Sequence, residues 1–373
     1  MVNRKIKIEL NNEIYDKDSV FASIALGGGF ITKDFLIDNE ITFAGSYAFY
    51  NILFQYWRLT CSHGGIRYDV LRGKSIISFS EEKREYIEKL KYILKKLFYD
   101  EYNQQDFEEA KNISKDTFER RYKSGKFRGK LKIFEFSDLN KKFELRELIN
   151  DIERIDFDTF ISCAKTLLVP GNIYLYINGA VHEAELIYDA VESVLPGRNH
   201  SVEVKNNYYD PYLKQDAHLL NLARENFSLS AVTFDFLHPG VTNFTKQVIL
   251  DFKAAYLPYS NVDIYVDSLD ANIIFENETL QPVKPLIYEE ILKEQFQLLK
   301  KKILQRYFTL LKKYPELFTM MGADMMVNDI SLAQYISFIG SCTYELYCEL
   351  CEKSHFKITE AQVVLKKEAV EFV

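Results

Sequence analysis

Runs of apolar and alternating residues divide the first half of the chain into predicted strands and helices. Residues 19–26 are mostly apolar and lead into three consecutive glycines, as expected of a buried strand that ends in a tight turn. Residues 45–59 form an apolar, aromatic-rich run of helical length, whereas the basic, glycine-containing residues 123–132 favour a loop. The other predicted elements are strands at 66–70, 75–80 and 173–178, and helices at 81–99, 103–122, 156–168 and 182–194.

The second half loosely repeats this order of elements. A strand at 229–237 is followed by a helix at 242–256. The stretch 329–336, which begins Asp-Ile-Ser-Leu, echoes 156–161, which begins Asp-Phe-Asp-Thr, and an alternating strand follows each. The other predicted elements are strands at 262–266, 272–276 and 361–366, and helices at 284–314 and 329–350.

The two halves predict an α+β fold with two tandem related domains. In each domain we expect helices to pack on one face of an antiparallel sheet, because a half-apolar sheet must bury that face. The domains are predicted at 1–197 and 213–373, joined by a polar connector at 198–212. The repeat distance far exceeds that of solenoid proteins, so the pattern indicates a domain duplication.

Composition and charge exclude several classes of function. The 373 residues are 47% hydrophobic and 27% charged, as in ordinary globular proteins. The net charge is -7 and, apart from the short basic stretch 123–132, no basic block occurs, which argues against nucleic-acid binding. Five cysteines, an N-terminus without an apolar signal region and the lack of an 18-residue apolar run together predict a cytoplasmic protein.

Several short pieces, taken in order, resemble a known peptidase family. They are Gly45 with Ile52-Leu53-Phe54, then 107–111, 155–160, and the turn 169–172 running into 173–179. This order resembles one half-size chain of the pitrilysin and mitochondrial-processing-peptidase family, the inverzincins. Members of that family bind zinc through a helix that carries H-x-x-E-H. The resemblance covers most of residues 1–195 and, more weakly, the rest.

The resemblance implies that the zinc motif has been lost. When Ile52-Leu53-Phe54 is matched to the apolar triplet after the family's second histidine, Tyr47 replaces the first histidine, Tyr50 the glutamate base and Asn51 the second histidine. Asp116 falls at the distal glutamate ligand. Phenols titrate near 10 and the amide is neutral, so these groups suit neither zinc binding nor activation of a water. We therefore predict no catalytic residues and no zinc here; the alternative is an aromatic core helix unrelated to any peptidase.

Two groups of residues are candidates for peptide binding. Gly27, Gly28 and Gly29 lack the spacing of a phosphate-binding loop and are expected where backbone or peptide comes close. The resemblance places substrate-holding residues near 252–266, where this chain offers Tyr256 and Tyr259 but no arginine.

A cysteine pair near the C-terminus has metal-like spacing. Cys348 and Cys351 are followed by His355, with Cys342 upstream. A continuous helix cannot wrap these side chains around one tetrahedral ion, and a second C-x-x-C is missing. The alternative is a set of buried thiols on a core helix.

The resemblance implies a non-catalytic subunit of a heterodimeric, zinc-peptidase-like complex. The partner would be a homologous chain that carries the zinc motif, and the pair would bind an extended precursor peptide. Similar bacterial pairs remove the leader from ribosomally made peptides in subtilosin-type bacteriocin maturation. The alternative is a stand-alone peptide-binding or scaffold protein without a peptidase partner, since fold alone does not determine function.

Overall fold

The chain forms two compact units in a computed structural model. One unit combines residues 1–115, 148–208 and 307–333, and the other combines 116–147, 209–306 and 334–373. These units differ from the contiguous predicted ranges because each takes one segment from the opposite half of the sequence. The structure describes residues 5–12, 18–30, 35–37, 40–42, 45–62, 64–137, 143–179, 184–196, 217–223, 227–238, 240–259, 262–266, 271–276, 286–287 and 289–367. The predicted connector 198–212 lies outside them.

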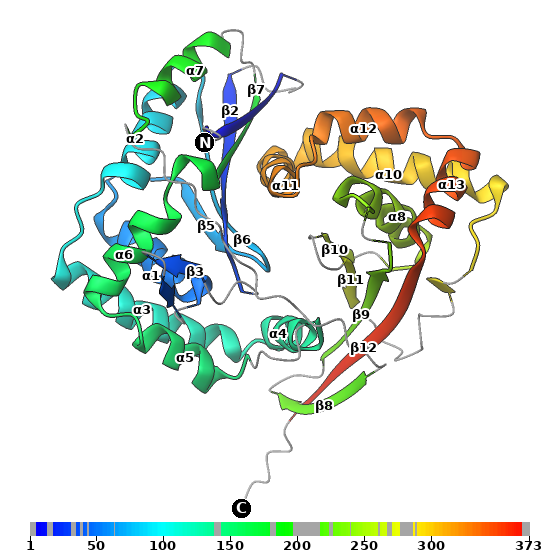
Figure 1. Cartoon of the computed structure of the whole chain (residues 1–373), viewed down its shortest axis with the longest axis horizontal. Coiled ribbons are helices and arrows are strands. Elements are labelled where there is room, and N and C mark those ends of the chain that lie inside the picture. The colour runs from blue at the N-terminus through cyan, green and yellow to red at the C-terminus, as the bar shows by residue number, and fades with distance from the viewer. Residues whose placement is uncertain are drawn as a thin grey trace, which may run out of the picture. The chain divides into compact units, whose positions relative to one another are not determined.

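The first unit is built on a five-stranded sheet with the order β1-β7-β2-β6-β5 (Figure 1). Its strands are β1 (Lys7–Asn11), β2 (Ser19–Gly27), β5 (Ile66–Val70), β6 (Lys74–Glu82) and β7 (Ile173–Gly179). β1 pairs with β7 in parallel, and the other neighbours are antiparallel. A separate antiparallel hairpin contains β3 (Phe35–Ile37) and β4 (Glu40–Thr42).

The two faces of this sheet differ in chemistry because side chains alternate along each strand. One face of β2 presents Val20, Ala22, Ile24 and Leu26, all nearly inaccessible to solvent, toward the helix layer. That layer contains α1 (Ser46–Thr60), α2 (Tyr86–Tyr99), the start of α3 (Gln104–Tyr122), α5 (Leu145–Glu153), α6 (Phe157–Leu167), the 3-10 turn η1 (Pro170–Asn172) and α7 (Ala184–Glu192).

The opposite face of the sheet is covered by α11 (Pro315–Val327), which comes from the second half of the sequence (Figure 1). The ring of Tyr176 on β7 lies against Gly322, and a Cβ at that glycine would be only 2.6 Å from the ring. Lys74 donates to the carbonyl oxygen of Asp324 at 3.1 Å and also forms an ion pair with its carboxylate. The prediction of helices on one face therefore misses a helix on the second face.

The second unit repeats the strand connectivity of the first. Its sheet has the order β8-β12-β9-β11-β10, so in both sheets the first strand pairs in parallel with the last. The strands are β8 (Ala217–Ala223), β9 (Phe227–Phe236), β10 (Val262–Val266), β11 (Ala271–Glu276) and β12 (Phe356–Lys367). This shared connectivity confirms the predicted α+β fold of two related halves, although each sheet is mixed because of its parallel pair.

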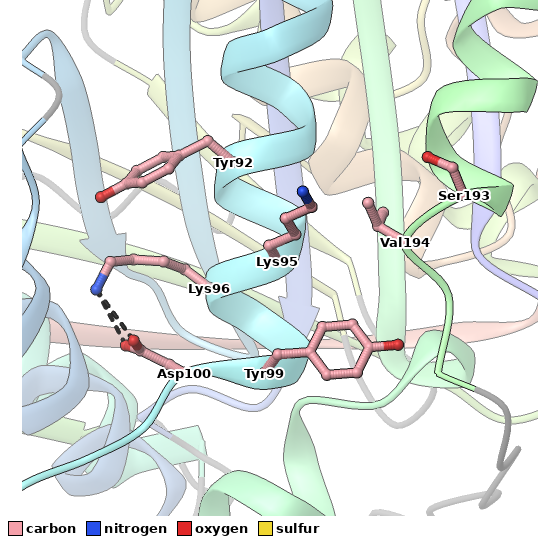
Figure 2. A pocket seen from close by; sticks show the side chains of 7 residues that line it. All are labelled: Tyr92, Lys95, Lys96, Tyr99, Asp100, Ser193 and Val194. Atoms are coloured by element: carbon pink, nitrogen blue, oxygen red, sulfur yellow. Dashed lines mark hydrogen bonds and ion pairs between the residues drawn. The ribbon is translucent and has the colours of Figure 1, made fainter.

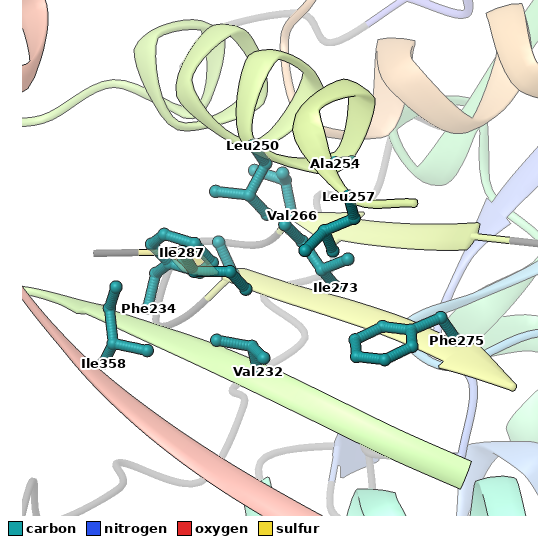
Figure 3. Close-up of a cluster of buried hydrophobic side chains, with 11 residues drawn as sticks. Val232, Phe234, Leu250, Ala254, Leu257, Val266, Ile273, Phe275, Ile287 and Ile358 are labelled. Carbon is teal, nitrogen blue, oxygen red and sulfur yellow. The ribbon is translucent and has the colours of Figure 1, made fainter. Parts of the chain in front are cut away.

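The core of the second unit lies between α8 (Asn243–Tyr256) and the sheet. Figure 3 shows Leu250 and Ala254 of α8 facing Val232, Ile273 and other apolar side chains of the strands. The remaining helices are α4 (Gly125–Ser137), α10 (Lys293–Lys313), α12 (Leu332–Ser341) and α13 (Tyr344–Ser354). α4 contacts β9 and β12. Among the described helices, none is both long and apolar enough to cross a membrane.

Some element predictions are confirmed and others are wrong. The predicted helix 156–168 is confirmed as α6, and Asp156 caps it by accepting a hydrogen bond from the Thr159 N–H at 2.8 Å. The predicted loop 123–132 is wrong, because most of it belongs to α4. The predicted helix 329–350 is interrupted: α12 ends at Ser341, and Thr343 caps α13.

Candidate functional site

α1 occupies the position at which the family resemblance places the zinc helix. It follows β2 and the glycine turn, and every residue from Ser46 to Trp57 is buried. A helix that is buried on all sides must satisfy its polar side chains within the protein. The hydrogen-bond partners of Tyr47, Tyr50 and Asn51 therefore show which role each of these side chains has in α1.

Tyr47 is held by a stacking contact and an acidic partner. Its ring stacks on Phe30 with a centroid distance of 5.3 Å, and its hydroxyl donates to the Asp151 carboxylate on α5. Arg154 lies 3.6 Å from the other carboxylate oxygen of Asp151. Tyr47, which the resemblance matches to the family's first histidine, thus joins two helices of the layer.

Asn51 is bound to its own helix. Its side-chain N–H donates to the backbone oxygen of Tyr47, one turn earlier, at 2.7 Å. A neutral amide in this arrangement cannot supply the basic nitrogen that zinc binds through histidine. Asn51, which the resemblance matches to the family's second histidine, therefore makes a hydrogen bond within its own helix.

Tyr50 connects α1 to the end of β2. Its hydroxyl donates to the Gly27 carbonyl oxygen at 2.9 Å. Burial raises the pKa of Tyr50 far above its ordinary value, so the phenol stays protonated at neutral pH. A protonated phenol that already donates its hydrogen cannot act as the base that takes a proton from a zinc-bound water.

The glycine turn is fastened by hydrogen bonds from the protein itself. The Gly27 oxygen also accepts from Asn172 at 3.2 Å, and the Gly28 oxygen accepts from Ser75 at 3.0 Å. Gly28 has φ +110°, a conformation that favours glycine, and a Cβ at Gly27 would lie 2.2 Å from Asn172 Oδ1. Other groups of this chain thus lie close to the glycine turn. A role for Gly27, Gly28 and Gly29 in peptide binding stays a prediction.

The other predicted site residues belong to the second unit. Asp116 is exposed on α3, where its backbone oxygen accepts from Arg120 Nε at 3.3 Å. Tyr256 donates to Glu289 at 2.6 Å, and Tyr259 stacks on Phe275 at a centroid distance of 4.5 Å. Their predicted roles remain untested by these contacts.

The described side chains contain no group of three or more His, Cys, Asp or Glu residues arranged to hold a metal ion. Cys348 and Cys351 lie on α13, and His355 ends that helix in a left-handed conformation with φ 39°. Burial raises the pKa of Cys351 to about 11, which favours the thiol over the metal-binding thiolate. Cys348 and Cys351 are half-buried and Cys342 is buried, so the alternative of buried thiols fits Cys342 alone, and metal binding by this group stays untested.

Next to α1, the edge strand β5 offers a surface for an extended peptide, a feature the sequence did not single out. In the sheet order β5 pairs with β6 on one side and ends the sheet on the other. Tyr68 of β5 stacks on Phe54 of α1 with a centroid distance of 5.1 Å. An edge strand can accept a peptide as an additional strand through its backbone.

Comparisons by sequence return neither a matching family model nor a matching curated protein. Comparison of structures is informative. A structure described as an M16-like peptidase from Alicyclobacillus acidocaldarius has a TM-score of 0.73 at 12% identity, over 97% of this chain and 96% of that chain. The inactive domain of an M16 peptidase from Pseudomonas fluorescens has a TM-score of 0.55 at 10% identity, over 97% and 95%.

The periplasmic protease PqqL from Escherichia coli is also similar, with a TM-score of 0.59 at 9% identity. The match covers 97% of this chain but 46% of PqqL. At these identities the comparisons establish a fold, and that fold is the one seen in M16-like peptidases, the pitrilysin type. It occurs in an inactive domain as well as in proteases.

Proposed function

We propose that this chain is the non-catalytic subunit of a heterodimeric peptidase, in which a homologous chain with an intact H-x-x-E-H supplies the zinc. The proposal rests on the side chains that α1 carries and on their hydrogen-bond partners. Tyr47 and Asn51, which the sequence resemblance matches to the family's two histidines, are bonded to Asp151 and to the helix backbone. Such groups hold the helix layer together and leave hydrolysis to the partner.

The size of the chain supports a paired arrangement. This chain matches PqqL over 97% of its own length but over 46% of that protein, which supports a role as one half of a two-part peptidase. A separate homologous chain would then supply the other half, whereas in PqqL both halves belong to one polypeptide.

The substrate we propose is an extended precursor peptide whose leader is removed during bacteriocin maturation. β5 can add such a peptide to the sheet beside α1, with backbone hydrogen bonds giving affinity. The net charge of -7 would attract a basic leader, and this attraction should weaken as salt screens it.

Affinity capture of the tagged chain from its native host tests the pairing. We expect stoichiometric recovery of a chain with an intact H-x-x-E-H, identified by mass spectrometry. Recovery of the chain only as a monomer or homodimer would contradict the pairing.

A stand-alone peptide-binding protein is the second candidate. It is favoured by the edge of β5, which belongs entirely to this chain and would need no partner to accept a strand. The two candidates differ in a peptide-binding experiment with the purified chain. Binding by the isolated chain, together with the absence of a zinc-bearing homologue from the capture, would favour this alternative.

A further inference from the structure

A groove on the helix layer of the first unit lies away from every residue assigned above. It is formed by the C-terminal half of α2 and the residues that follow α7, and its volume is about 460 Å³. This volume is within the range of small-molecule sites. Its lining residues are Tyr92, Lys95, Lys96, Tyr99, Asp100, Ser193 and Val194 (Figure 2).

One side of the groove is a fixed polar network. Lys96 forms an ion pair with Asp100 at 3.1 Å and donates to Thr60 Oγ1 at 3.2 Å. The indole N–H of Trp57 donates to the same Asp100 carboxylate at 2.9 Å. The charge of Asp100 is therefore balanced within the protein, and little negative charge remains to oppose an incoming anion.

The other side of the groove carries a cation beside apolar surface. Lys95 is exposed, and within the described part of the chain neither a hydrogen bond nor an ion pair engages its amine. Figure 2 shows Lys95 and the ring of Tyr99 on the side of α2 that faces Ser193 and Val194. Tyr99 is 55% exposed and Val194 is buried, so an apolar floor adjoins a free positive charge.

We propose that this groove binds a carboxylate joined to an aromatic or aliphatic body. The Lys95 amine would pair with the carboxylate, and the body would cover Tyr99 and Val194. The same chemistry is presented by a free aromatic acid and by the C-terminal residue of a peptide. The ion pair between Lys95 and the carboxylate favours anionic ligands, although the net charge of -7 repels anions from the protein as a whole. This proposal is independent of the proposed subunit function.

Trp57 makes the proposal directly measurable. It is the single tryptophan of the chain, and its N–H is bonded to a residue that lines the groove. A ligand in the groove changes the surroundings of Asp100, so we expect a saturable change in tryptophan fluorescence. The three probes are N-acetyl-phenylalanine, 3-phenylpropionate and the uncharged N-acetyl-phenylalaninamide.

We expect both acids to bind the full chain and the amide to bind several-fold more weakly. Lys95→Glu should weaken binding of the acids by about tenfold, because attraction becomes repulsion. Lys91→Glu is the control: it makes the same charge change on α2 outside the groove, where it removes the ion pair of Lys91 with Glu88, and it should leave binding unchanged. Circular dichroism establishes that both variants are folded.

The relative affinity of the two acids identifies the source of the ligand. Tighter binding of N-acetyl-phenylalanine points to a peptide C-terminus, and tighter binding of 3-phenylpropionate points to a free acid. The proposal is overturned if neither acid gives a saturable change, if the amide binds as well as the acids, or if Lys95→Glu and Lys91→Glu bind them equally.

Discussion

At the scale of single residues, the hydroxyl groups of α1 differ in the charge of their acceptors. Tyr47 donates to a carboxylate that is 6% exposed, whereas Tyr50 donates to a neutral carbonyl. Hydrogen bonds to buried charged groups contribute more to stability than those to neutral groups. Each hydroxyl can be removed without changing the ring.

Tyr47→Phe should therefore lower the free energy of unfolding by about 1.5–3 kcal/mol, and Tyr50→Phe by about 0.5–1.5 kcal/mol. Urea denaturation of the two variants measures this difference. An equal or larger loss for Tyr50→Phe would show that the Tyr47–Asp151 contact does not hold the helix layer as described.

Two buried asparagines in the first unit give a second comparison. Asn172 donates to the carbonyl oxygens of Gly27 and Leu167, at 3.2 and 2.9 Å. Asn178 is fully buried, and among the residues that the structure describes neither of its side-chain polar atoms has a hydrogen-bond partner. The first residue stabilises the glycine turn, and the second bears the cost of burial without compensation.

Asn172→Leu should destabilise the protein by about 1–3 kcal/mol because two buried acceptors lose a donor, whereas Asn178→Leu should leave stability unchanged or raise it. Thermal denaturation of both variants in one buffer tests the contrast. A large loss with Asn178→Leu would mean that its amide has a bound partner, such as an ordered water.

At the scale of elements, α11 depends on a glycine for its position on the sheet. A Cβ at Gly322 would lie 2.6 Å from the Tyr176 ring, whereas nothing lies within 4 Å of a Cβ at Gly340 on α12. Both glycines are inside helices, where alanine has the better intrinsic propensity. They form a matched pair that separates packing from propensity.

Gly322→Ala should cost about 1–3 kcal/mol through overpacking against Tyr176, and Gly340→Ala should gain about 0.5–1 kcal/mol. Chemical denaturation gives both values. Equal stability of the Gly322→Ala and Gly340→Ala variants would contradict the close packing of α11 against Tyr176 of β7.

The elements predicted correctly are those whose signals are local. Asp156 caps α6 through a residue three positions away, and the apolar face of β2 is visible in its own sequence. α4 and α11 were missed because each contains glycine and owes its position to contacts with strands distant in sequence. Positions 47, 50 and 51 could be selected by resemblance, but not the partner of Tyr47, which lies 104 residues away.

At the scale of the whole molecule, each unit contains a buried tyrosine–aspartate contact between two helices. In the first unit Tyr47 donates to Asp151, and in the second Tyr335 donates to Asp251 at 2.6 Å. An arginine accompanies each aspartate, Arg154 at 3.6 Å and Arg306 at 3.8 Å. The helix that follows the second strand takes part in each contact with exchanged roles, because α1 supplies the tyrosine and α8 supplies the aspartate.

Because α1 serves this structural role, the purified chain should neither bind stoichiometric zinc nor cleave peptides by itself. Metal analysis after dialysis against zinc, together with a peptide-cleavage assay, tests this expectation. One zinc per chain bound through α1, with peptide cleavage, would refute the assignment of α1 as a non-catalytic helix.

The most direct measurement of the central claim is the rate at which the zinc-bearing homologue removes the leader, with and without this chain. We predict that an equimolar amount of this chain raises the rate by about tenfold or more, equivalent to about 1.4 kcal/mol of transition-state stabilisation. A partner lacking the motif's glutamate should be inactive in both conditions. An unchanged rate with the intact partner would contradict the account of this chain as a peptidase subunit.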